Sequence, residues 1–433
     1  MARLVACGFA WVLPVLAIAS SSSREDPALE ILGRTLGPTS ILSDLEELTD
    51  DVGGRPSGSA ALSQAVVWGI DKFRAAGLVN VRSEPYTVPV LWLPGAEFGS
   101  VIRPNSRTLA VALLPFSSGT GAAGVLWMST RPGRILYRHS VRFDDVIDHL
   151  PGAMIDREDA LRISRALAAG KPVRVKVVTE PQILVNTVLA NVVGEVRGYT
   201  KPAESVVLGA HLDSWDLGQG ALDNGCNAAL VVDAARQIAA VAREHQPRRT
   251  IRFVLYTGEE AGFLGSQADA RLHRAELDQT VAMITFDAGT GRTTGCSTGG
   301  RADVVAAADA ALQPAVSLGP FTQTTDAFIG TDNYDYLVEG VPNFVANQDV
   351  DTYLPNYHAG SDTFDKVDTR ELKANTAVAA VFTWGLANSE RRPGSRQTRS
   401  EVATVIKATA FDQKMRAFSL WTDFESGKRG RQP

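Results

Sequence analysis

The stretch 211–216, with the sequence HLDSWD, places a histidine and an aspartate two positions apart, directly after the apolar run 205–210. Neutral imidazole is the commonest metal ligand among protein side chains, and its second ring nitrogen needs a partner that fixes the tautomer. In an extended segment, Asp213 points to the same side as His211 and could be that partner. The pair is typical of a metal site at a strand end, and equally of a hydrogen-bonded structural histidine.

Carboxylates and a second histidine farther along the chain favour the metal site. Asp223 lies in a Gly-rich loop, where it could cap a helix or bridge two metal ions with its two oxygens. Glu259 and Glu260 are adjacent, so their side chains point in different directions: one can bind metal while the other serves the metal-bound water as general base. Asp287 follows another apolar run, and His358 lies in a loop far downstream.

This set of side chains indicates zinc. Two histidines and three carboxylates as ligands, with one carboxylate left as base, suit zinc in an open geometry. Five protein ligands suit two Zn²⁺ per chain that share one carboxylate and one water, and such a pair activates the water and polarises a carbonyl. The remaining histidines lie in charged or helical segments and are expected at the solvated surface: His139, His149, His245 and His273.

The elements that must position these residues alternate between strands and helices. Strands are expected at 188–193, 206–210, 251–256 and 281–286, and helices at 226–243 and 264–274. This order predicts an α/β fold with a mostly parallel central sheet that is covered on both faces. In such sheets ligands gather beyond the carboxyl ends of the strands. Three of the candidate segments follow a predicted strand directly, which favours the metal site over separate structural roles.

Composition limits the function classes. The chain has 433 residues, of which 45% are hydrophobic, so it can bury a large core. A net charge of −5 offers no general attraction for nucleic acid. The basic C-terminal end, 428–431, is expected to be a solvated, frayed terminus.

The N-terminal segment 1–23 is predicted to be a secretory signal peptide. Arg3 is its only charge, an apolar run extends from 4 to 19, and Ala17-Ile18-Ala19 suits cleavage. A retained anchor is the alternative. After cleavage the protein is expected to be secreted or periplasmic, without stable membrane association. Cys226 and Cys296 would then remain, either as a disulfide or as two buried thiols.

Five segments resemble the M28 family of dizinc exopeptidases. They are HLDSWDLGQGALDNG at 211–225, TGEEAGFLGS at 257–266, FDAGTG at 286–291, GTDNYDYLVEGVP at 330–342 and YHAGSDTFDKVD at 357–368. The resemblance implies a three-layer α/β/α sandwich and the removal of terminal residues from short peptides or dipeptides. It also allows a homodimer.

The resemblance also assigns roles. His211 and Asp287 would hold one zinc, Glu260 and His358 would hold the other, and Asp223 would bridge the two. Glu259 would be the general base, and Asp213 would orient His211. Trp215, Asp332, Tyr334 and Tyr357 are candidates to line the pocket, with core packing as the alternative for each.

Three features depart from the family pattern. Asn224 stands where a second acidic residue is frequent, and Cys226 could be an extra ligand or a buried structural thiol. A small insert related to protease-associated domains looks shortened. The expected segments are the signal peptide at 1–23, the catalytic domain at 24–115 and 181–390, the insert at 116–180, and a C-terminal tail or helix at 391–433.

Two other functions remain open at this point. One is a binding ectodomain that has lost its metals, although no ligand is missing from this sequence. The other is a single-zinc enzyme resembling glutaminyl cyclases, which metal stoichiometry would distinguish.

Overall fold

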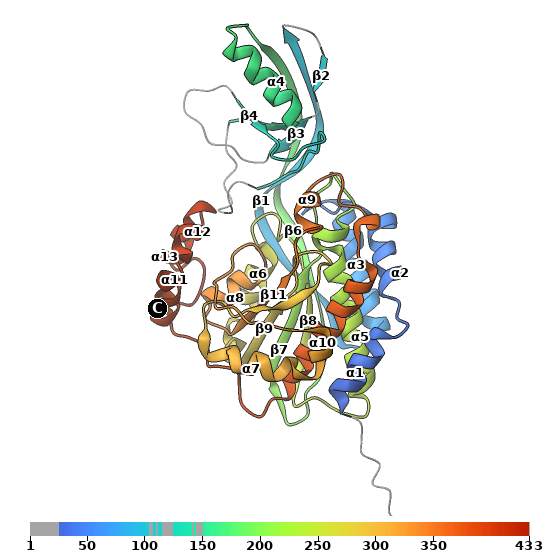
Figure 1. Cartoon of the computed structure of the whole chain (residues 1–433). Helices are drawn as coiled ribbons and strands as arrows, with labels where there is room; N and C mark the ends of the chain where they lie inside the picture. Colours follow the sequence, from blue (N-terminus) through green and yellow to red (C-terminus); the bar gives the residue numbers. More distant parts are fainter. Residues whose placement is uncertain are drawn as a thin grey trace, which may run out of the picture.

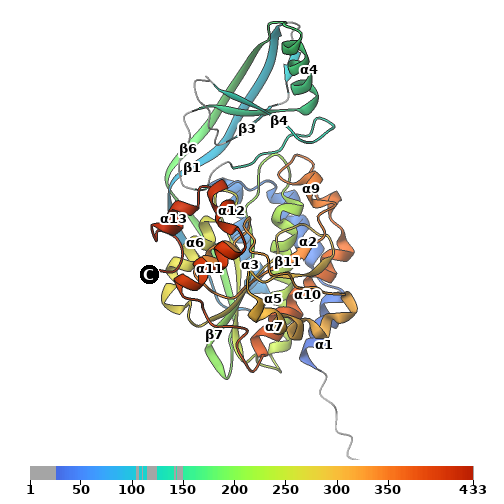
Figure 2. The ribbon, with the colours of Figure 1, turned by 60° about the vertical axis from the view of Figure 1, so that its left-hand side comes forward.

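A computed structural model describes residues 26–103, 107–109, 111–114, 124–140, 143 and 150–432. The predicted signal peptide, Cys7, His149 and the beginning of the predicted insert at 116–123 lie outside the described residues. Figures 1 and 2 show a large α/β body with a smaller lobe that projects from one end of it. Among the described residues, no helix combines the length and the apolar composition that crossing a membrane requires.

The centre of the body is a sheet of eight strands in the order β10-β11-β9-β7-β8-β6-β1-β2. Its four parallel strands are β7 (Lys201–His211), β8 (Arg249–Tyr256), β9 (Thr280–Thr285) and β11 (Asn343–Gln348). Antiparallel strands flank them: β10 (Thr293–Ser297) on one side, and β6 (Arg174–Val196), β1 (Val79–Arg103) and β2 (Arg107–Leu109) on the other. The predicted parallel centre is therefore present, and antiparallel strands form both edges.

Neighbouring residues of the central strands belong to different hydrophobic cores. Val206 and Leu208 pack in the main core, whereas Val207 packs with Val254 and Met283 in a second core. Successive side chains of a strand point to opposite faces, so this division places a core on each side of the sheet. Every residue of β8 and β9 is buried, which explains why the stretches 253–256 and 281–284 are continuous apolar runs rather than alternating ones.

Helices cover both cores (Figure 1). The main core lies under α1 (Pro27–Leu36), α2 (Ile41–Glu46), α3 (Ala60–Ala75), α5 (Cys226–Ala242), α7 (Val305–Leu312) and α10 (Thr369–Asn388). The other face carries α6 (Leu264–Leu272) and α8 (Asn333–Val338), backed by α11 (Arg399–Ala408), α12 (Phe411–Ala417) and α13 (Trp421–Glu425). The helices predicted at 226–243 and 264–274 are confirmed to within two residues.

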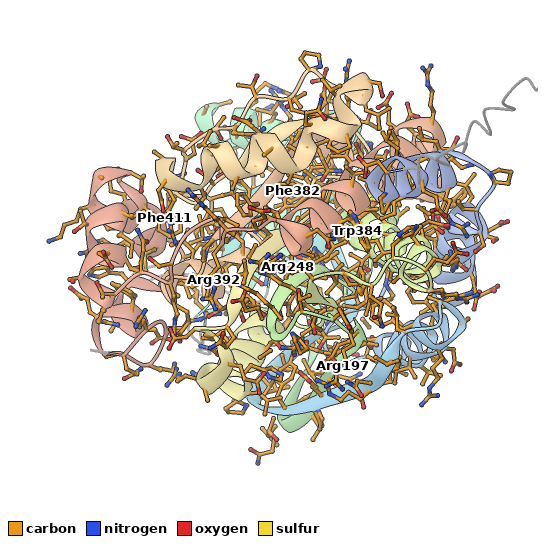
Figure 3. All side chains as sticks on the ribbon, turned by 90° about the horizontal axis from the view of Figure 1, so that it is seen from below. Arg197, Arg248, Phe382, Trp384, Arg392 and Phe411 are labelled. Atoms are coloured by element: carbon orange, nitrogen blue, oxygen red, sulfur yellow. The ribbon has the colours of Figure 1, made fainter. Side chains whose placement is uncertain are left out.

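The C-terminal end is not frayed, contrary to the expectation from its charge. Arg429 is buried, and its Nε and Nη2 atoms each lie 3.0 Å from a carboxylate oxygen of Asp335 in α8. The ion pair fastens the last described residues to the body. The end of the body that faces away from the lobe, seen from below in Figure 3, carries Arg197, Arg248 and Arg392.

The lobe is built on a long antiparallel ribbon. Strands β1 and β6 pair from Val79 and Glu195 in the body out to Arg103 and Arg174 in the lobe. The lobe adds a second sheet, ordered β3-β5-β4, and helix α4 (Arg157–Ala168). The strands of this sheet are β3 (Val111–Leu114), β4 (Val125–Met128) and β5 (Gly152–Ile155). Strand β6 runs without interruption through the expected boundary at 180/181, and the domain limits themselves stay a prediction.

Candidate metal centre

The predicted ligands gather at one edge of the sheet because the strands that carry them are parallel. His211 is the last residue of β7, Glu259 and Glu260 lie in the turn after β8, and Asp287 lies just after β9. These positions are the carboxyl ends of three adjacent strands, where ligand sites of α/β sheets form. Their loops lie at the end of the body from which the lobe projects, since Asp216 forms an ion pair with Arg138 of the segment that follows β4.

Two clusters of ligand atoms share one carboxylate. In the first, Nε2 of His211 lies 3.0 Å from Oδ1 of Asp287 and 3.2 Å from Oδ1 of Asp223. In the second, Nε2 of His358 lies 3.1 Å from Oδ2 of Asp223 and 3.0 Å from Oε2 of Glu260. Within each group of three the ligand atoms lie within 4.8 Å of one another, which is close enough to hold one metal ion. Asp223 turns one oxygen toward each cluster.

Both imidazoles are oriented by main-chain carbonyls. Nδ1 of His211 lies 2.9 Å from the carbonyl oxygen of Asp213, and Nδ1 of His358 lies 2.9 Å from that of Arg138. A carbonyl only accepts hydrogen bonds, so each Nδ1 carries a proton, and Nε2 is the nitrogen that presents a lone pair when the ring is neutral. That tautomer is the one that binds a metal through Nε2.

The carboxylate of Asp213 has a different set of partners from the one expected. It accepts hydrogen bonds from Oγ of Ser57 at 2.6 Å and from the backbone N–H groups of Glu259 at 3.2 Å and Glu260 at 3.3 Å. Its Oδ1 is 3.7 Å from Nδ1 of His211. Asp213 thus contacts His211 through its carbonyl, while its carboxylate joins the loop after β7 to the turn after β8.

The buried charges of this region suit a cation. Burial raises the pKa of Glu260 to about 7, because the nearby His358 only partly offsets the loss of solvent. Burial also opposes the protonation of His358, yet Glu260 and Asp223 outweigh it and raise its pKa to about 10. Oε1 of Glu260 has no hydrogen-bond partner among the described residues. Buried carboxylates with open oxygens beside two oriented imidazoles are the surroundings that a divalent ion stabilises.

Glu259 lies beside the two clusters and belongs to neither. Its Oε2 is 3.9 Å from Nε2 of His211, and its side chain is buried. Burial raises its pKa well above the ordinary value, and the neighbouring Asp287 and Glu260 add to this rise against the effect of His211. A carboxyl group of raised proton affinity beside the ligands, but outside them, has the properties of a general base.

The structure gives Trp215, Asp216 and Tyr357 distinct places. The Tyr357 ring stacks on His358 with 3.6 Å between centroids, and the Trp215 ring lies 5.9 Å from His358 and 6.4 Å from Trp92 of β1. Both rings form part of the wall beside His358. Asp216 is an ion-pair partner of Arg138.

Asp332 and Tyr334, from one predicted motif, differ in their surroundings. Asp332 is buried, and neither of its carboxylate oxygens has a hydrogen-bond partner among the described residues. Tyr334 packs between Phe263 and Phe411, with ring centroids 5.7 and 6.2 Å away. Tyr334 is therefore a core residue of the α8 side.

Cys226 and Cys296, the two cysteines among the described residues, are free and buried. Sγ of Cys226 donates a hydrogen bond to the carbonyl of Leu222 at 3.3 Å, and burial raises the pKa of its thiol. Cys226 belongs to neither metal-binding cluster. Among the alternatives drawn from the sequence, two buried thiols are what the structure contains.

Sequence reasoning was wrong about His139, which was expected at the solvated surface. Its ring lies 5.2 Å from that of His358, and its Nδ1 lies 2.6 Å from the carbonyl of Ser140. Burial lowers its pKa to about 4. No periodic pattern surrounds this residue in the sequence, because it lies in an irregular segment that reaches the site only through the tertiary fold.

Sequence reasoning also missed Arg55. The guanidinium is fully buried and donates to the carbonyls of Leu212 at 2.8 Å, Gln219 at 2.8 Å and Gly220 at 2.9 Å. These carbonyls belong to the loop that connects His211 with Asp223. Arg55 therefore fixes the separation of two predicted ligands.

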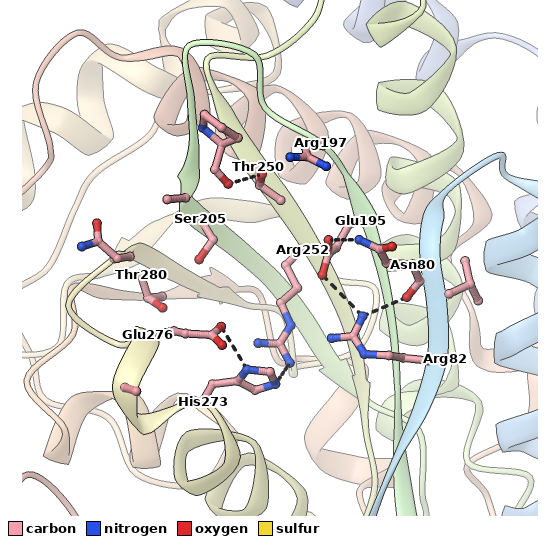
Figure 4. Close-up of a pocket in the computed structure, with 15 residues that line it drawn as sticks. Asn80, Arg82, Glu195, Arg197, Ser205, Thr250, Arg252, His273, Glu276 and Thr280 are labelled. Carbon is pink, nitrogen blue, oxygen red and sulfur yellow. Dashed lines mark hydrogen bonds and ion pairs between the residues drawn. The ribbon is translucent and has the colours of Figure 1, made fainter.

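A second polar region lies at the opposite end of the parallel strands. A cavity of about 920 Å³ is lined by Arg82, Glu195, Arg197, Arg252 and His273, among others (Figure 4). It lies where β7, β8 and β9 begin, so it is separate from the candidate metal centre.

His273, at the edge of this cavity, is the second histidine wrongly expected at the surface. It forms a third group of possible metal ligands with Glu84 and Asp269. Nη2 of Arg252 already lies 3.0 Å from Glu84, 2.6 Å from Asp269 and 2.7 Å from His273. Because a guanidinium occupies the centre of this group, it is a structural ion-pair network rather than a cation site.

Comparison with known proteins gives consistent matches. The model of peptidase family M28 matches residues 191–383. The chain is 26% identical over 401 residues to carboxypeptidase Q of Homo sapiens, and the alignment covers 79% of this chain and 84% of that protein. Carboxypeptidase Q of Rattus norvegicus is 27% identical over 404 residues, with the same shares covered.

Solved structures agree with these matches. The crystal structure of a peptidase M28 precursor from Shewanella amazonensis superposes with a TM-score of 0.76 at 27% identity, and covers 86% of this chain and 98% of that one. A zinc aminopeptidase from Bacillus subtilis shares the fold, with a TM-score of 0.63 at 15% identity over 83% of this chain and 98% of that one. Residues 191–383 thus resemble peptidase family M28, the fold resembles that of a solved M28 peptidase, and the chain is a metallo-exopeptidase that acts on peptides.

Proposed function

We propose that this chain is a zinc-dependent exopeptidase that removes terminal residues from short peptides or dipeptides at a centre of two zinc ions. The observation that carries the proposal is the place of Asp223 between the two histidines. Its Oδ1 lies 3.2 Å from His211 and its Oδ2 lies 3.1 Å from His358. A carboxylate that serves two adjacent ligand clusters is the arrangement that two metal ions in one site require.

The residues present fit two ions. His211 and Asp287 would complete one ligand set, and Glu260 and His358 would complete the other, with Asp223 common to both. The open oxygen of Glu260 and the lone pairs on both Nε2 atoms are donors that zinc accepts. When bound, two such ions lower the pKa of water and polarise a carbonyl group.

Glu259 acts as the general base in this proposal. Its carboxylate takes a proton from the attacking water and returns it to the leaving amine. The hydrogen bonds from the backbone N–H groups of Glu259 and Glu260 to Asp213 hold the turn that carries this residue. The burial of Glu259 excludes competing water and raises its pKa, so that it accepts a proton readily.

Secretion is part of the same proposal. The support is the composition of residues 1–23. Sequencing the N-terminus of the exported protein tests it, and a mature chain that begins near residue 20 is the expected result. A chain that retains residue 1 and stays with the membrane fraction would show an anchor instead.

The experiment that tests the activity combines metal analysis with a substrate panel. Purified protein is assayed for zinc content, and for hydrolysis of dipeptides and tripeptides with free and blocked ends. We expect two zincs per chain, release of a terminal residue, and loss of activity with a chelator that added zinc restores. Comparison of the blocked peptides then reveals whether the amino or the carboxyl end is recognised.

Other outcomes point to the two remaining functions. One tightly bound zinc with cyclisation of N-terminal glutamine would replace the proposal by a cyclase. No bound zinc and no hydrolysis of any peptide would indicate a binding ectodomain. The complete ligand set favours the peptidase over both.

A further inference from the structure

The second of the two ligand clusters is contacted by a segment that belongs to the lobe. Residues 129–140 follow β4 and cross from the lobe to the body, and we name this segment the strap. The backbone N–H of Arg138 donates to the carbonyl of His358 at 3.1 Å, while Nδ1 of His358 donates to the carbonyl of Arg138 at 2.9 Å. Tyr137 and Ala359 form an antiparallel β-bridge beside them. The strap thus pairs with the loop that carries His358.

The conformation of His358 needs such support. Its φ is 57°, in the left-handed region that non-glycine residues rarely occupy. A residue held in this region is strained and persists only where its surroundings fix it. The two hydrogen bonds with Arg138, one through the carbonyl of His358 and one through its ring, stabilise this conformation.

The strap also reaches the other ligand that is specific to this cluster. Oγ of Ser140 donates to the carbonyl of Glu260 at 2.9 Å. In contrast, within the part of the strap that the structure describes, no hydrogen bond reaches His211 or Asp287. The described part of the strap therefore forms hydrogen bonds with both ligands specific to one cluster and with neither ligand specific to the other.

The side chain of Arg138 locks the strap in place. Its guanidinium is buried, with Nε 2.5 Å and Nη2 3.0 Å from the carboxylate of Asp216, and with Nη2 2.8 Å from Glu97 of β1. Asp216 lies in the loop that follows β7, and Glu97 lies on the lobe part of the ribbon. One arginine thus joins the lobe, the loop after β7 and the His358 loop.

We propose that Arg138 is a positioning residue through which the lobe completes the cluster of Asp223, Glu260 and His358. The inference rests on the proposed function, in which this cluster holds one of two zinc ions. Without the guanidinium the strap loses its attachment to Asp216 and Glu97, and His358 loses the rigid carbonyl that orients its ring. The other cluster keeps all of its own contacts.

The test is zinc binding measured by chelator competition on metal-free protein, with Arg138→Met, Arg138→Lys and a control, Arg165→Met, on the exposed face of α4. We expect wild type and the control to bind two zincs with the same two affinities. In Arg138→Met one affinity falls about 10- to 100-fold, as when other partners that orient metal ligands are removed. The second affinity stays within about 2-fold, and Arg138→Lys is intermediate because a lysine replaces only part of the forked contact.

Activity gives a second signature. The zinc concentration for half-maximal turnover rises in Arg138→Met, and excess zinc restores turnover. A merely structural role would lower the melting temperature without changing the zinc dependence. If Arg138→Met does not fold, Glu97→Gln and Asp216→Asn replace it in the test. Each removes one ion-pair partner of the same guanidinium and should lower the affinity for the same zinc ion.

The outcomes separate the two proposals. Wild type that binds fewer than two zincs overturns the proposed function, and the role of Arg138 falls with it. Wild type that binds two zincs, together with a folded Arg138→Met that binds both with unchanged affinity, overturns only the role of Arg138.

Discussion

Oδ1 of Asp213 accepts the backbone N–H of Glu259 at 3.2 Å, so a residue just beyond β7 holds the turn that follows β8. Oδ2 of the same carboxylate accepts the N–H of Glu260 and the hydroxyl of Ser57. The carboxylate is fully buried and accepts all three hydrogen bonds. It therefore sets the position of both glutamates relative to His211.

Replacing Asp213 with asparagine should reduce catalysis more than metal binding. The amide keeps the size of the side chain but turns a donor toward backbone N–H groups, which displaces the turn at 259–260. We expect kcat/KM to fall about 10- to 100-fold. Zinc content should stay at the wild-type value, because the carbonyl of Asp213 that orients His211 is retained.

Steady-state kinetics and metal analysis check this prediction, with Asp51→Asn at an exposed position as the matched control. Wild-type kcat/KM in Asp213→Asn would show that the turn holds its position without this carboxylate. Loss of zinc would show that the residue acts on His211 instead.

The ion-pair network around Arg252 should give the protein an acid-sensitive stability. Burial opposes ionisation of Glu84, but its hydrogen bond with His273 and the charge of Arg252 outweigh burial and lower its pKa to about 2. A carboxylate with a lowered pKa stabilises the folded state above its unfolded value of about 4.3, and this contribution disappears as the pH falls toward 2. The full contribution of this single group is about 3 kcal/mol.

The stabilisation by this network also decreases at higher pH, because His273 loses its proton there. Burial opposes its protonation, and the hydrogen bond with Glu84 outweighs burial and raises its pKa above 6.5. Its contribution is therefore complete below pH 6.5 and disappears as the pH rises through the raised value. The network should stabilise the fold most between about pH 4.5 and 6.5.

Thermal unfolding between pH 2 and 9 measures this dependence in wild type and in Glu84→Gln. The difference in stability between the two should be greatest near pH 5–6 and should shrink toward pH 2. Glu276→Gln, whose side chain is mostly exposed beside His273, is the control and should change little. A difference that does not vary with pH would contradict the assigned pKa directions.

Tyr334 should prove to be a core residue rather than a substrate contact. Its ring is fully buried, and its hydroxyl has no hydrogen-bond partner among the described residues. Removing an unpaired buried hydroxyl relieves a desolvation cost, so Tyr334→Phe should be neutral or stabilising by up to about 1 kcal/mol. Urea unfolding and peptide hydrolysis measure the two properties. A loss of activity with unchanged stability would place the hydroxyl in the substrate pocket.

The sequence predicted the parallel centre of the sheet because buried parallel strands leave a strong trace. The runs that contain Val206, Phe253 and Met283 are apolar on both faces, and a candidate metal ligand or general base follows shortly after the end of each run. The same reasoning gathered His211, Glu260 and Asp287, since the carboxyl ends of neighbouring parallel strands share one edge.

The lobe contacts could not be predicted in this way. Arg138 and His139 lie in an irregular segment, and nothing local indicates that they contact a loop more than 200 positions away. The outer halves of β1 and β6 are half-exposed and carry no continuous apolar run. At the outer end of the ribbon the paired residues, Arg103 and Arg174, are 71 positions apart in the sequence. No local pattern indicates a pairing between segments so far apart.

The most direct test of the account is to compare Glu259→Gln with Glu260→Gln for zinc content and turnover. Glu259 lies outside both clusters and Glu260 inside one. We expect Glu259→Gln to keep two zincs and to lose turnover by about 10²- to 10⁴-fold, the usual contribution of a general base. Glu260→Gln should bind one zinc more weakly. Loss of zinc in Glu259→Gln, together with full zinc content in Glu260→Gln, would contradict the assigned roles.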